Sequence, residues 1–140
     1  GNLKINSFSL KTYFWKMKLE DNCFLNLENK SGSNAFLHAS CTEWKNKFLF
    51  EIFGQFGKIE ITGLGKSYGE EKLIFYKMSK KMGIPTKKVF KFSKKDSSWI
   101  KELEEFYIDI VKKRISSPSL IDIYKNLKII NTIYKNSDHN

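Results

Sequence analysis

The sequence predicts an α+β fold, in which an open, mostly antiparallel β-sheet of about six to seven strands precedes two C-terminal helices packed on one of its faces. Three observations predict this fold class. Apolar and polar residues alternate with the period of a β-strand between residues 3 and 92. Glycine-containing turns interrupt that alternation. From residue 96 onward the apolar residues recur with the period of an α-helix instead.

The first three predicted strands lie before residue 45. Residues 3–10 alternate loosely, and the segment that follows them is irregular. Residues 22–28 place Cys23, Leu25 and Leu27 on one face, because side chains along a strand point alternately to its two sides. A turn rich in Asn, Ser and Gly leads to the third strand, which is predicted over residues 35–44.

Four more strands are predicted in the middle of the chain, over residues 47–53, 58–62, 73–78 and 88–92. In the first of these, alternation puts Phe48, Phe50 and Ile52 on one face. Gly54 and Gly57 bracket a short loop, which predicts a hairpin between the first two of these strands.

Two helices are predicted at the C-terminal end. Residues 96–98 form an N-cap cluster before an apolar stripe, and a second stripe begins at Leu120. Acidic residues lie early and basic residues late in the first helix, as the helix dipole favours, and Pro118 separates the two helices. The first stripe consists of Trp99, Leu103, Phe106 and Ile110, and the second of Leu120, Ile123, Tyr124, Leu127, Ile130 and Tyr134.

One domain is expected. A chain of 140 residues fits a single domain, here residues 1–136 followed by a polar tail at 137–140. Two helices cover only one face of the predicted sheet, yet its other face also carries large apolar groups. Because a monomer seldom exposes so much apolar surface, we expect a homo-oligomer that assembles through this open face. The interface candidates are Phe36, His38, Ser40, Phe48, Phe50 and Ile52.

The composition argues against nucleic-acid and membrane partners. The net charge is +10, but of 25 basic residues only Arg114 is an arginine. Recognition of bases and phosphates favours the bidentate guanidinium group, so we expect no nucleic-acid partner. No apolar run approaches the roughly 20 residues that span a bilayer, so no membrane partner is expected either. Cys23 and Cys41 make no disulfide framework, and a cytoplasmic location is expected.

No catalytic, cofactor-binding or metal site is predicted within the chain itself. The segment GLGKS at 63–67 resembles the end of a P-loop, but Glu60 occupies the position of the first required glycine. Tyr68 likewise replaces the third glycine of the dinucleotide-binding fingerprint. His38 has no ligands at a metal-binding spacing, so a packed or interface position is expected for it.

Two groups of residues are candidates for contact with a small-molecule substrate. A polar triplet before the second strand offers hydrogen-bond partners for hydroxyl groups, with turn formation and strand capping as its alternative roles. Three aromatic rings offer stacking surfaces for a sugar, with core or interface positions as the alternative. The candidates are Trp15, Glu20, Asp21, Asn22, Trp44 and Tyr68.

Several short motifs, in this order and spacing, resemble the C-terminal domain of the glucose–fructose oxidoreductase / inositol dehydrogenase (Gfo/Idh/MocA) family. They are EDN at 20–22, HASCTEWKN at 38–46, EIFG at 51–54, GLGKSYG at 63–69 and DSSW at 96–99. The resemblance implies a dihydrodipicolinate reductase-like C-terminal domain, whose open sheet supplies part of the substrate pocket and the contact between subunits.

Members of this family are NAD(P)-dependent oxidoreductases of sugars, cyclitols and nucleotide sugars, and an N-terminal Rossmann domain binds their cofactor. The family's catalytic lysine lies in a Glu-Lys-Pro motif, which this sequence lacks. The family's Asp…His pair also has no match here, so no catalytic role transfers to any residue of the chain.

The resemblance therefore implies the substrate-side and oligomerisation domain of an NAD(P)-dependent sugar or nucleotide-sugar oxidoreductase. The parent enzyme would bind NAD or NADP, and the chain by itself is expected to hold no cofactor and to be inactive. Two alternatives stay open, a stand-alone β-sheet module that self-associates and a Lys-rich nucleic-acid-binding domain.

Overall fold

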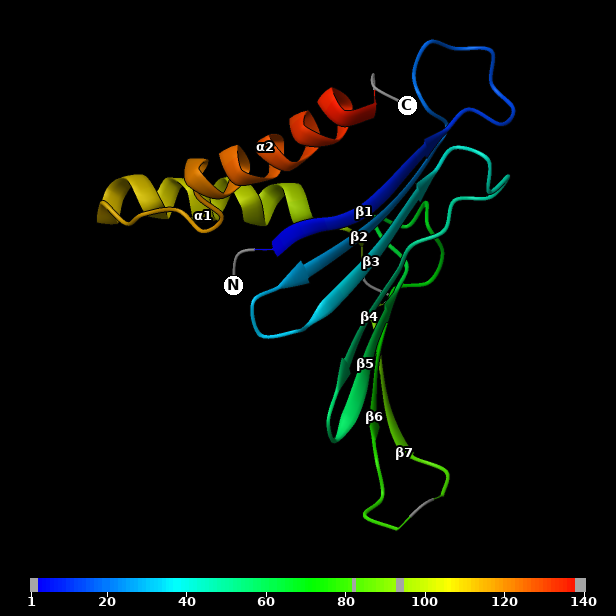
Figure 1. Ribbon diagram of the computed structural model, residues 1–140. Helices are drawn as coiled ribbons and strands as arrows, with labels where there is room; N and C mark the ends of the chain where they lie inside the picture. Colours follow the sequence, from blue (N-terminus) through cyan, green and yellow to red (C-terminus); the bar gives the residue numbers. More distant parts are fainter. Residues whose placement is uncertain (1–2, 82, 93–94, 138–140) are drawn as a thin grey trace. The chain divides into compact units, whose positions relative to one another are not determined.

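The part of the chain that the structure describes folds into seven strands and two helices in the predicted order (Figure 1). The computed structural model describes residues 3–81, 83–92 and 95–137. All strand pairs are antiparallel, so the predicted α+β class is confirmed. The elements are β1 (Leu3–Lys11), β2 (Asn22–Asn29), β3 (Asn34–Ser40), β4 (Leu49–Gly54), β5 (Gly57–Thr62), β6 (Lys72–Lys77), β7 (Thr86–Lys91), α1 (Ser98–Lys112) and α2 (Leu120–Ser137).

The strands form two sheets, so the prediction of a single open sheet is wrong. One sheet has the order β1-β2-β3 and the other the order β4-β5-β6-β7. The strand predicted over residues 35–44 ends at Ser40, and Trp44 has a φ of 56°. An extended strand does not continue through that left-handed conformation, so β3 stops well before β4 begins.

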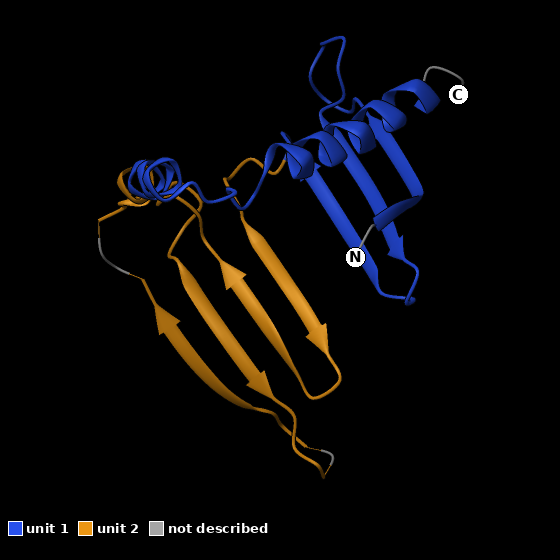
Figure 2. Ribbon diagram, turned by 90° about the vertical axis from the view of Figure 1, so that its left-hand side faces the viewer, with its two compact units in different colours: residues 1–42, 102–140 blue, residues 43–101 orange. Residues whose placement is uncertain are grey.

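The chain divides into two compact units, which Figure 2 shows in different colours. Unit 1 comprises residues 1–42 and 102–140, and unit 2 comprises residues 43–101. That residues 1–136 act as one domain stays a prediction. Ser137 is the last residue of α2, and the rest of the predicted polar tail lies outside the described residues.

Unit 1 holds a buried apolar core between its sheet and α2. Leu25 and Leu27 of β2 are buried, and Ile133 of α2 packs against them. Phe8 of β1 lies opposite Leu25 in the register, so it shares the face that α2 covers. The prediction that a C-terminal helix packs on one face of a sheet is therefore confirmed for α2.

The other helix, α1, buries none of its residues. Asp96 accepts the backbone N–H of Ser98 at 2.9 Å where the helix begins, in agreement with the predicted N-cap cluster. The predicted apolar stripe of α1 stays exposed, from 60% at Ile110 to 77% at Trp99. Neither α1 nor any other described helix is long and apolar enough to cross a membrane.

Unit 2 is a four-stranded antiparallel meander. Gly54 lies opposite Gly57 in the register, which confirms the predicted hairpin. A Cβ atom at Gly57 would lie 2.3 Å from the carbonyl oxygen of Tyr76, so β5 and β6 approach closely at a position that only glycine fits. No apolar side chain among the described residues of unit 2 is buried.

Candidate functional site

Asp21, directly before β2, is the centre of a polar cluster in unit 1. Its side chain is only 2% exposed and accepts the backbone N–H groups of Tyr13, Phe14 and Trp15 at 2.8–3.0 Å. Burial alone raises the pKa of the Asp21 carboxyl, but the hydrogen bonds that it accepts, first that from Phe14, lower it well below 3.8. The carboxylate is thus ionised at neutral pH and holds the irregular segment between β1 and β2.

Asn22 extends the cluster into the sheet. Its amide group donates to Asp21 Oδ1 at 3.0 Å and to Thr42 Oγ1 at 2.9 Å. Its oxygen lies 3.0 Å from His38 Nε2, and since that oxygen only accepts, Nε2 carries the proton. Ser40 lies opposite Asn22 in the register and bonds to Thr42 at 3.0 Å. The cluster therefore links β2, β3 and the segment after β3.

The neighbouring carboxylates Glu20 and Asp21 have different partners. The hydroxyl group of Tyr134 in α2 donates to Glu20 at 2.6 Å, and this hydrogen bond raises the pKa of Tyr134. The triplet Glu20, Asp21 and Asn22 thus ties a loop, β2 and α2 together within unit 1. Contact of these three residues with a substrate stays a prediction.

The three predicted aromatic candidates lie in different settings. Trp15 belongs to the cluster, because its indole N–H donates to the carbonyl oxygen of Cys41 at 3.1 Å. Trp44 follows the cluster in sequence and its side chain is 71% exposed. Tyr68 lies on the loop between β5 and β6, where it lines a cavity of unit 2. Their roles in substrate binding stay predictions.

The interface candidates of unit 1 share one face of β3. Phe36, His38 and Ser40 point away from the side that α2 covers, since their register partners alternate along β2 with Leu25 and Leu27, the residues that pack against α2. The ring of His38 stacks on Phe24, its partner in the register, with centroids 4.4 Å apart. This face combines two phenylalanines with serine and asparagine side chains.

One face of the unit 2 sheet is largely apolar, with Lys77, Thr86 and Lys88 at its β6 and β7 side. Phe50 and Ile52 of β4, both interface candidates, begin two rows of opposed residues across this face and are 50% and 47% exposed. Phe48, the third candidate there, precedes β4. The rows are Phe50, Ile61, Leu73, Phe90 and Ile52, Ile59, Phe75, Lys88, and we call this surface the apolar face.

The opposite face of the same sheet carries charged residues that pair with one another, and we call it the charged face. Lys58 forms ion pairs with Glu51 and with Glu60, and these bonds raise the pKa of Lys58. Its ammonium group also lies 5.2 Å from the ring centre of Phe53 and 5.5 Å from that of Tyr76. Such a surface is well hydrated, whereas the rows that begin at Phe50 and Ile52 on the apolar face contain a single charged residue, Lys88.

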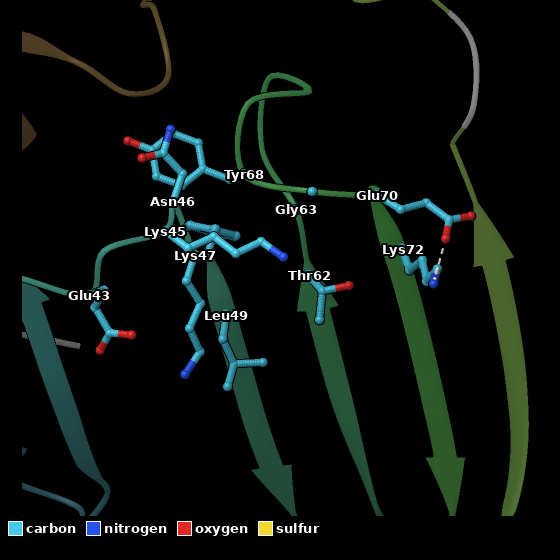
Figure 3. A pocket seen from close by; sticks show the side chains of 12 residues that line it. Glu43, Lys45, Asn46, Lys47, Leu49, Thr62, Gly63, Tyr68, Glu70 and Lys72 are labelled. Carbon is cyan, nitrogen blue, oxygen red and sulfur yellow. Dashed lines mark ion pairs between the residues drawn. The ribbon is translucent and has the colours of Figure 1, made fainter.

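A cavity of about 640 Å³ lies in unit 2 where β4 and β6 begin and β5 ends (Figure 3). Tyr68 was the only predicted site residue among its lining side chains besides Phe48. The prediction missed Lys45, Asn46 and Lys47, because it extended the third strand to residue 44 and began the fourth at 47. The lining residues are Glu43, Lys45, Asn46, Lys47, Phe48, Leu49, Thr62, Gly63, Tyr68, Gly69, Glu70 and Lys72.

Neither a metal centre nor a disulfide is found in the described part of the chain. No group of three or more His, Cys, Asp or Glu residues there is arranged to hold a metal ion. Cys23 and Cys41 are free thiols, and burial, followed by the charge of Glu20, raises the pKa of Cys23.

Comparison of the chain with protein-family models, curated proteins and solved structures finds no match. The function is therefore argued from the surfaces just described.

Proposed function

We propose that this chain is the substrate-side and assembly domain of an NAD(P)-dependent sugar or nucleotide-sugar oxidoreductase. In this proposal another part of the parent protein holds NAD or NADP, and the unit 2 sheet joins two subunits. The assembly role is supported by the apolar face, and the oxidoreductase role by the motifs at 20–22, 38–46 and 63–69. We also propose a cytoplasmic location, where Cys23 and Cys41 stay reduced as free thiols.

The apolar face is the observation that carries the proposal. A small sheet becomes stable when a hydrophobic face packs against another layer, and unit 2 buries no apolar side chain among its described residues. Exposed apolar patches of this kind mark surfaces that meet another protein. A second copy of the same face is a fitting partner, because two sheets pack face to face at about 10 Å with their side chains interdigitated.

Two matched substitutions test this role. Ile52 on the apolar face and Val89 on the charged face are both β-branched, lie in edge strands and are 47% and 43% exposed. Ile52→Lys places an ammonium group in the proposed interface and should convert dimers into monomers, with an increase of at least about tenfold in the dissociation constant. Val89 lies opposite Ile74 on the face that also carries Glu51 and Glu60, so Val89→Lys should leave the dimer intact.

Light scattering during size-exclusion chromatography measures the outcome for the unchanged chain and both variants. The proposal is contradicted by a monomeric unchanged chain at tens of micromolar, or by equal dissociation of the two variants. The same face also supports the second candidate function, a stand-alone self-associating module. A dinucleotide-binding fingerprint in the coding sequence upstream of Gly1 would favour the oxidoreductase over that module.

A further inference from the structure

We propose that the unit 2 cavity binds a phosphorylated sugar, with the phosphate held by Lys45 and Lys47 and the sugar ring placed against Tyr68. This inference deepens the proposed function and rests on it for the sugar. The volume of about 640 Å³ lies within the range of small-molecule pockets, roughly 300–1,000 Å³. Lys45, Asn46 and Lys47 line the cavity from the segment before β4, and Tyr68 lines it from the loop after β5 (Figure 3).

Three lysines and two carboxylates, Glu43 and Glu70, line the cavity. Glu70 pairs with Lys72 at 2.6 Å and with Lys91 at 3.4 Å, and the hydrogen bond from Lys72 lowers the pKa of Glu70. These charges are therefore already compensated. Lys45 and Lys47 form no ion pair with any carboxylate among the described residues. Two ammonium groups without an ion pair at the wall of a cavity attract a dianion such as a phosphate monoester.

The loop that carries Tyr68 is held in place before any ligand arrives. Gly63 has a φ of 77°, and a Cβ atom there would lie 2.6 Å from the carbonyl oxygen of Glu70, so the two ends of the loop meet closely. The ammonium group of Lys66 donates to the carbonyl oxygen of Phe92 at 3.0 Å. Within the loop, the N–H of Tyr68 donates to the carbonyl oxygen of Leu64 at 3.2 Å. A pre-formed loop lowers the entropy cost of binding.

The remaining lining groups suit a sugar rather than a bare anion. Asn46 offers an amide that donates and accepts, and Thr62 offers a hydroxyl group. The ring of Tyr68 provides an apolar surface for the C–H face of a sugar. The loop's backbone N–H groups at Ser67 and Tyr68 already bond within the loop, so they do not form a phosphate-binding nest. Recognition of the phosphate thus depends on the two lysines.

Calorimetric titration of the whole chain tests the site, with glucose 6-phosphate, UDP-glucose, glucose, inorganic phosphate and NADH as probes. Glucose 6-phosphate should bind at least about tenfold more tightly than glucose or inorganic phosphate, and salt should weaken its binding. Tighter binding of UDP-glucose would assign the phosphate to a nucleotide sugar instead of a sugar monophosphate. Failure of both phosphorylated sugars to bind a folded chain overturns the inference, as does equal binding of glucose or inorganic phosphate.

Matched variants locate the site. Lys45→Ala with Lys47→Ala should weaken the binding of glucose 6-phosphate at least about tenfold. Lys80→Ala with Lys81→Ala removes the same charge from the β6–β7 connection and should have no effect. Equal losses of affinity in the two double variants would mean that binding depends only on the net charge of the chain, and would overturn the proposed site. Tyr68→Ala should weaken the binding of glucose 6-phosphate but not the binding of inorganic phosphate.

Different measurements contradict the proposed function and the sugar-phosphate site. Micromolar binding of NADH to the chain, or a monomeric state in light scattering, contradicts the proposed function even when glucose 6-phosphate binds. A chain that dimerises and ignores NADH but binds neither phosphorylated sugar keeps the proposed function and loses this inference.

Discussion

The two sheets of this chain are built alike and completed differently. Both are antiparallel meanders with large apolar side chains on one face. In unit 1, α2 covers that face and buries Leu25 and Leu27 under Ile133. Among its described residues, unit 2 has no layer of its own over the corresponding face, and Phe50 and Ile52 stay about half exposed. The difference indicates that unit 1 has its own core, whereas unit 2 has no buried apolar side chain among its described residues.

The most damaging change to unit 1 should be the loss of its helix contact. Ile133→Ala removes a side chain that is 5% exposed and should lower the free energy of unfolding by about 2–5 kcal/mol. Ile121→Ala makes the same truncation on α2 at a position that is 66% exposed. This control should change the free energy of unfolding by less than about 0.5 kcal/mol. Urea unfolding followed by circular dichroism measures both, and similar losses would mean that α2 is not the cover of this sheet.

A smaller loss is expected from a backbone clash in unit 2. Gly57→Ala places a Cβ atom 2.3 Å from the carbonyl oxygen of Tyr76 and should cost about 1–3 kcal/mol, because β5 and β6 must move apart. Gly54→Ala is the control, since its nearest atom would lie 3.4 Å away. Hydrogen exchange should show faster exchange in β5 and β6 and unchanged protection in β2. Loss of protection in both units would show that they unfold together.

The smallest expected effect concerns Asp21 and depends on pH. The folded chain lowers the pKa of this carboxyl, so its stabilisation is complete above the unfolded value of roughly 3.9 and is lost as the pH falls from there toward the folded pKa. Asp21→Asn should lower the melting temperature by about 5 °C at pH 7 and by less at pH 3. Glu28→Gln, at an exposed position of β2, the strand that Asp21 precedes, serves as the control. An equal loss at both pH values would contradict the role of the charge.

Most of the fold was predicted from patterns among neighbouring residues, such as apolar alternation and helix caps. The alternation of Cys23, Leu25 and Leu27 placed the core face of β2 correctly, and the N-cap cluster located the start of α1. The turn at Trp44 was missed because its left-handed conformation has no signature in the residue types around it. Because the third strand was predicted to run through Trp44, a single sheet was predicted. The lysines that line the cavity, Lys45 and Lys47, were for the same reason not named as site candidates. The polar cluster was missed in part because Thr42 had been assigned to a strand.

The sequence by itself determined the strands, the helices, their order and the excess of lysine, since these depend on neighbouring residues. Only the tertiary structure decided that α2 covers β1–β3 and that α1 stays exposed. It also divided the strands into two sheets and left the apolar face of unit 2 open. The physical reason is distance along the chain. The core joins Leu25 to Ile133, and no periodicity within either segment specifies which apolar face receives a helix.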